Sequence, residues 1–339
     1  SRDLLIRQGI EACQKSGYQE MTLSSLSSSD YRQLEGLCDG LLDYCTPRNI
    51  NLNLPSLRAD GFSMSIMEKL QRSRKSSITF APEAGTQRLR DVINKNVTEE
   101  DLLKSCRTVF EGGCNAVKLY FMLGLPTETD DDVLGIADLA NKVYLCWRQY
   151  AVIRARGIRI TVSTSFFVPK PFTPFQWEAQ ITMEEYQRRV QLLRSAITNK
   201  SIIYNWHDPD TSYLEAVFAR GDRRLAPVIE EAWRQGAKFD SWSEYFDLER
   251  WLTACRTCGV DPDFYATRER TKDEVLPWSH ISVGVRPAYF WREREQAYKS
   301  VITPDCRVQC MGCGADRLLE CGKCDEALTR RERAERGEV

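Results

Sequence analysis

Strand-like and helix-like segments alternate along the first half of the chain, and this alternation restricts the possible folds more than any other feature. Short apolar or alternating runs predict strands at 19–26, 49–54, 77–80, 116–122 and 158–168. Strands separated by helices form parallel sheets with right-handed crossovers. We therefore predict an α/β fold. The lack of a GxGxxG turn and the polar residues at strand ends favour a barrel-type sheet with its site at the carboxyl face.

The segment 116–129, AVKLYFMLGLPTET, contains the clearest strand. Its largely apolar run indicates a buried strand, and the Gly124-Leu125-Pro126 turn ends it. Thr129 then begins a helix whose first turn is acidic, as the helix dipole favours. Lys118 interrupts the apolar run, so its ammonium must reach water, pair with a carboxylate or face a polar lumen.

Polar residues follow the other strands of the predicted sheet. Serines are concentrated after the strand at 19–26, Arg58 follows the strand at 49–54, and Glu83 follows the strand at 77–80. A guanidinium at a strand end suits a carboxylate ligand, and a carboxylate suits an ammonium group or ribose hydroxyls. Turn and capping chemistry also explains the serines.

Several of these segments together resemble one family. The blocks SLSSSDY, NLPSLRAD, TFAPEAGTQRLRDVINK, VKLYFMLGLPTET and FFVPKPFTPFQW are similar to strand-end blocks of radical S-adenosylmethionine (SAM) proteins. The closest resemblance is to uncharacterised members that pair a cobalamin-binding-like region with a methylthiotransferase-like barrel. The resemblance implies that bound SAM is surrounded by Ser27, Ser56, Arg58, Glu83, Lys118 and Gly124.

The same resemblance implies the architecture and the domain organisation. We expect a partial (β/α)6 TIM-like barrel without its first strand at 1–175, a helical extension at 176–300 and a Cys-rich tail at 301–339. In such enzymes a Cys-x3-Cys-x2-Cys loop after the first strand holds a [4Fe–4S] cluster, which reduces SAM to a radical that abstracts hydrogen from a substrate. The chain as given has no such loop before its first predicted strand.

We therefore interpret the chain as the carboxy-terminal part of a radical SAM iron–sulfur enzyme with an unknown substrate. A separate amino-terminal half is the expected partner that carries the SAM cluster and, by family analogy, cobalamin.

The tail contains the strongest metal motif in the sequence. Its candidate ligands are Cys306, Cys310, Cys313, Cys321 and Cys324. The two CxxC pairs, Cys310/Cys313 and Cys321/Cys324, fit a four-thiolate zinc site, although the spacing between them is short. An auxiliary iron–sulfur cluster on Cys306, Cys310 and Cys313 fits equally well.

Composition limits the remaining function classes. The net charge of −1 argues against a protein whose whole surface binds nucleic acid, and we interpret the basic run at 154–159 as a solvated helix end in preference to an RNA contact. Thirteen cysteines without an export signal predict a reducing, cytoplasmic location, and no run reaches the roughly 18 apolar residues of a membrane span.

Two alternative functions stay open on the sequence. One is a methylthiotransferase-like enzyme that modifies RNA or protein. The other is a catalytically silent, zinc-binding scaffold subunit.

Overall fold

The strands form two sheets in which every pairing is parallel. The structure, a computed structural model, describes residues 1–25, 31, 33–53, 78–155, 157–306 and 308–315. The smaller sheet pairs β1 (Glu20–Thr22) with β2 (Asn51–Asn53). The larger sheet has the order β3-β4-β5-β6, with β3 at Ile78–Glu83, β4 at Ala116–Leu123, β5 at Arg159–Phe166 and β6 at Ile202–Trp206.

The predicted α/β class is confirmed. All five expected strands are present, and β3, β4 and β5 follow one another in the sheet in sequence order, as successive crossover connections predict. Within the described residues the sheets do not close into a barrel. β6 adds a sixth strand beside β5, so the sheet extends beyond residue 175.

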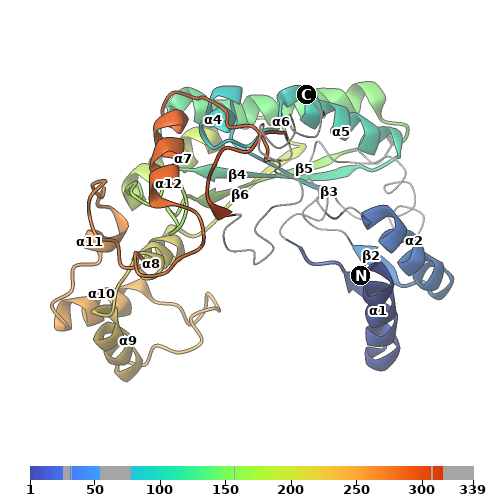
Figure 1. The fold of residues 1–339 in the computed structure, drawn as a ribbon. Coiled ribbons are helices and arrows are strands. Elements are labelled where there is room, and N and C mark those ends of the chain that lie inside the picture. Colours follow the sequence, from blue (N-terminus) through green and yellow to red (C-terminus); the bar gives the residue numbers. More distant parts are fainter. Residues whose placement is uncertain (26–30, 32, 54–77, 156, 307, 316–339) are drawn as a thin grey trace, which may run out of the picture.

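Helices cover one face of the larger sheet. α5 (Glu99–Glu111), α6 (Asp130–Tyr150) and α7 (Met183–Ala196) lie on the same side of it (Figure 1). Alternate residues of β4 bury themselves under these helices, namely Val117, Leu119, Phe121 and Leu123. Since side chains along a strand alternate between the two faces, the residues between them face the other side.

Two satellite regions flank the larger sheet. On one side, α1 (Arg2–Ser16), α2 (Leu34–Cys45) and the short 3-10 helix η2 (Thr46–Arg48) accompany β1 and β2. On the other, four helices follow β6, namely α8 (Pro209–Ala219), α9 (Leu225–Arg234), α10 (Leu248–Thr257) and α11 (Asp263–Ala266). The satellites have their own apolar clusters, so each is packed locally.

Two further helices lie near the carboxyl ends of the strands. α4 (Gln87–Val92) follows β3, and α12 (Pro287–Ala297) returns from the far end of the chain to contact it. Among the described helices, none has the length and apolar character needed to cross a bilayer.

Candidate functional site

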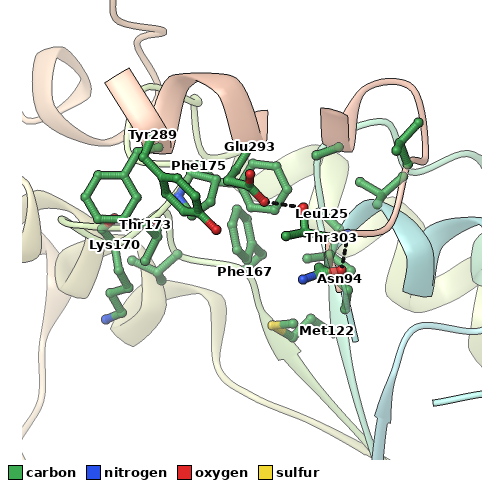
Figure 2. Close-up of a pocket in the computed structure, with 17 residues that line it drawn as sticks. Asn94, Met122, Leu125, Phe167, Lys170, Thr173, Phe175, Tyr289, Glu293 and Thr303 are labelled. Carbon is green, nitrogen blue, oxygen red and sulfur yellow. Dashed lines mark hydrogen bonds between the residues drawn. The ribbon is translucent and has the colours of Figure 1, made fainter. Parts of the chain in front are cut away.

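A cavity of about 400 Å³ lies at the carboxyl ends of β4 and β5. Met122 and Leu125 line it from the end of β4, and Phe167 lines it from the end of β5. Tyr289 and Glu293 of α12 form another wall, as Figure 2 shows. The wall is mostly apolar with a few polar groups, which is typical of small-molecule sites.

Polar contacts join segments that line the cavity. The amide of Thr303 donates to Oδ1 of Asn94 at 3.0 Å, and the Thr303 hydroxyl donates to the Glu293 carboxylate (Figure 2). These bonds connect the segment after α12 to the loop after α4 and to α12 itself. The cavity therefore depends on segments more than two hundred residues apart in the sequence.

The face of the sheet opposite α5–α7 is polar and leads toward this cavity. Lys118 of β4 lies beside Thr161 of β5, and Tyr120 lies beside Ser163. One step further along, Met122 of the cavity wall lies beside Ser165. The sequence interpretation missed the serine and threonine residues of β5, although their strict alternation with buried Val162, Thr164 and Phe166 was a readable signal.

The turn that ends β4 is held by a buried carboxylate. Gly124 has a positive φ of 91°, and its amide donates to the Glu128 carboxylate at 2.7 Å. Arg189 of α7 forms an ion pair with the same carboxylate. Burial raises the pKa of Glu128 to about 7, although the Gly124 amide and Arg189 favour the ionised form. The turn thus has a fixed shape that was not evident from the Gly-Leu-Pro motif alone.

The loop that follows β3 packs directly on the start of α6. A Cβ at Gly85 would lie 2.4 Å from the Asp132 carbonyl oxygen and from the Ile136 amide nitrogen, so only glycine fits there. Thr86 and Arg88 both donate to the Asp132 carboxylate. Asp132 therefore ties the loop after β3 to the helix after β4, and the two strand ends are held as one unit.

The three predicted SAM-site residues within the described chain lie at different places. Glu83 ends β3 with a φ of 68°, and its carboxylate accepts a bond from Lys95 at 3.0 Å. Lys118 is the third residue of β4 and is exposed on the sheet face opposite α5–α7, and Gly124 follows the end of that strand. None of the three lines the 400 Å³ cavity. The other predicted residues, Ser27, Ser56 and Arg58, lie outside the described residues.

The described part of the Cys-rich tail forms a tight turn against α12. The Ala315 amide donates to Sγ of Cys313 at 3.4 Å, and Gly312 and Gly314 have positive φ angles of 67° and 98°. The Arg286 amide donates to the Cys313 carbonyl at 3.0 Å, and the Arg292 guanidinium donates to the Met311 carbonyl at 2.8 Å.

Metal-ligating side chains do not gather in threes anywhere in the described ranges. Cys306 and Cys310 are exposed, whereas Cys13, Cys38 and Cys45 are buried on or against α1 and α2. Cys321 and Cys324 lie outside the described residues. The described residues therefore supply neither a complete SAM-cluster ligand set nor a complete tail site.

Comparison with known proteins gives one family match and one relative. Residues 4–140 match the model of the radical SAM superfamily. An uncharacterised protein of Methanocaldococcus jannaschii is 28% identical over 215 residues, which cover 62% of this chain and 43% of that protein. The chain thus spans about two fifths of the length of this curated relative. The family match includes β1 to β4, and with them Glu83, Lys118 and Gly124.

Proposed function

We propose that this chain is part of a radical SAM enzyme and that it binds SAM at the carboxyl edge of its larger sheet. One observation carries the proposal: the polar sheet face opposite α5–α7 leads to a cavity at the carboxyl ends of β4 and β5, and β4 lies in the segment that matches the superfamily. Ligands of parallel α/β sheets bind at this edge because the loops that differ between proteins converge there.

Polar and apolar groups of the chain would bind different parts of SAM. The Lys118 ammonium is exposed on the sheet face opposite α5–α7, and it would attract the carboxylate of SAM. The apolar wall formed by Met122, Leu125 and Phe167 would take the adenine and exclude water from it. Glu83 would contribute only if it exchanged or shared its bond with Lys95.

The [4Fe–4S] cluster of the superfamily does not fit the described cysteines. Cys13, Cys38 and Cys45 are buried among apolar residues of the α1/α2 region, and the described ranges contain no three-ligand group. Our proposal is that thiolates outside the described residues, on a separate amino-terminal half, hold it, and that any cobalamin binds there too.

SAM binding to the full chain tests this proposal. We expect titration calorimetry to detect SAM binding, and Lys118→Met to weaken it about tenfold, since a charge-assisted bond to a carboxylate contributes roughly 1.5–3 kcal/mol. Lys142→Met is the matched control, because Lys142 lies on α6 and pairs with Glu99 of α5. Unchanged affinity in Lys118→Met, or no SAM binding by the wild-type chain, would contradict the proposal.

We also propose that the tail binds a metal ion through its cysteines. The Ala315 amide-to-sulfur bond and the two left-handed glycines are features of the tight knuckles that surround metal thiolates. Anaerobic purification followed by metal analysis separates the two forms of the site. Zinc that persists in Cys306→Ser supports a four-thiolate site on the CxxC pairs, whereas iron that is lost in Cys306→Ser supports an auxiliary cluster. Metal-free protein would contradict both.

A further inference from the structure

Two arginines are buried without a carboxylate partner in the part of the chain that follows β6. Arg220, at the end of α8, has no exposed surface, and Arg270, just beyond α11, is 3% exposed. Burying a charged group without a counter-charge costs several kcal/mol, so arginines at this depth are normally paired.

The two guanidinium groups converge on the same short stretch of backbone. Nη1 of Arg220 donates to the Ala266 carbonyl at 2.8 Å. Nη2 of Arg270 donates to the neighbouring Tyr265 carbonyl at 3.2 Å and to the Arg220 carbonyl at 3.4 Å. The side chains therefore lie next to each other, and each uses only part of its five N–H groups.

Three nitrogens of this pair have no hydrogen-bond partner among the described residues. They are Nε and Nη2 of Arg220 and Nη1 of Arg270. Burial lowers the pKa of Arg220 to about 9 and that of Arg270 to about 10, and repulsion from neighbouring arginines adds to both shifts. Both values lie above 7, so both groups stay charged at neutral pH and the pair keeps two positive charges.

The nearby carboxylates of Glu178 and Glu274 form ion pairs with other arginines. Glu274 forms a two-pronged pair with Arg268 at 2.6 and 2.8 Å. Glu178 binds Arg294 and also accepts a bond from the Tyr298 hydroxyl at 2.7 Å. Neither is hydrogen-bonded to the buried pair. The described surroundings thus contain more positive than negative charge at this place.

We propose that a small monovalent anion of the size of chloride binds the free N–H groups of Arg220 and Arg270. A water molecule would satisfy hydrogen bonds but would leave the charge uncompensated. Near-complete burial of both side chains excludes a large anion, and a monovalent ion suits the modest excess of charge.

The anion would also support the loop that lines the cavity. The Arg270 amide donates to the Trp177 carbonyl at 2.8 Å, and the Gln180 amide donates to the Ala266 carbonyl at 3.0 Å. Gln180 in turn donates from its side chain to the Phe167 carbonyl at 3.2 Å, and Phe167 lines the cavity. The site nevertheless stands independently of the proposed SAM binding.

The test compares thermal unfolding of the full chain in sodium chloride and in sodium gluconate at equal ionic strength. A ligand that binds only the folded state raises the midpoint by about 2–4 °C for each tenfold rise in concentration above its dissociation constant. We expect chloride, but not gluconate, to give this continuing rise with the logarithm of the concentration. Arg270→Gln should abolish the difference, and the control Arg268→Gln, on the same loop but paired with Glu274, should keep it.

A structural measurement keeps the proposal testable if Arg270→Gln fails to fold. Crystals of the wild-type chain soaked in sodium bromide should show an anomalous peak between the two guanidinium groups. Equal midpoints in chloride and gluconate with no bromide peak would mean that water alone fills the site, and would overturn the proposal. A bromide peak without stabilisation by chloride would indicate binding at crystal concentration only, and would overturn it as well.

Discussion

At the scale of single residues, Glu128 is the titratable group most closely tied to the geometry of the candidate site. It accepts the Gly124 amide at 2.7 Å, so it fixes the turn from which Leu125 reaches the cavity. Its ordinary pKa of 4.5 rises to about 7 because the carboxyl is buried. The folded chain therefore keeps a proton on Glu128 over a pH range in which the unfolded chain has lost it.

This difference predicts an unusual dependence of stability on pH. Between pH 4.5 and 7 the folded state binds more protons at Glu128 than the unfolded state, so the contribution of this residue to stability falls as the pH rises. From pH 5 to pH 8 the expected loss is about 2 kcal/mol. Glu128→Gln keeps an acceptor for Gly124 but does not titrate, so its stability should vary less over the same range.

Urea unfolding of both proteins at several pH values measures this effect. Glu184→Gln, an exposed carboxylate in the first turn of α7, is the control and should follow the wild-type profile. If Glu128→Gln and the wild type have parallel profiles from pH 5 to pH 8, Glu128 does not titrate in this range and the argument from its burial is wrong.

At the scale of helices and strands, local patterns predicted most of the larger sheet. The sequence Thr98-Glu99-Glu100-Asp101 resembles a capping box, and the structure has one there at the start of α5. The same motif at Thr129 and Asp132 begins α6. Helix caps and alternating apolar runs involve residues only three or four positions apart, so helix starts and strands can be predicted from the local sequence.

Long-range pairing was less accessible to sequence analysis. Residues 201–205 carry only a short strand-like pattern, and their place beside β5 depends on residues about forty positions away. Glu83 was predicted to bind an ammonium group or ribose hydroxyls of SAM, and in the structure its partner is the ammonium of Lys95, which reaches back from beyond α4. The sequence analysis did not predict that α12 lines the cavity, because no local sequence pattern indicates which later helix packs near the sheet.

At the scale of the whole molecule, the cavity joins three parts of the chain. Asn94 comes from the region of β3, Phe167 from the end of β5, and Glu293 from the helix that precedes the tail. The tail turn is hydrogen-bonded to the same helix through Arg286 and Arg292. Any ligand of the tail cysteines would therefore act on the element that closes the cavity.

Ala297 offers the sharpest test that this assembled cavity is part of the SAM site. It is a buried residue of α12 that lines the cavity, and the space beside it can take the three extra carbons of Leu. We expect Ala297→Leu to weaken SAM binding at least about tenfold, as small volume changes do in tight apolar pockets, while the thermal midpoint changes little. Ala288→Leu places the same side chain at an exposed position of the same helix and should bind SAM normally. The two substitutions report on opposite ends of the proposed ligand. If Ala297→Leu binds SAM normally while Lys118→Met binds it weakly, SAM lies on the polar sheet face and the cavity binds another molecule.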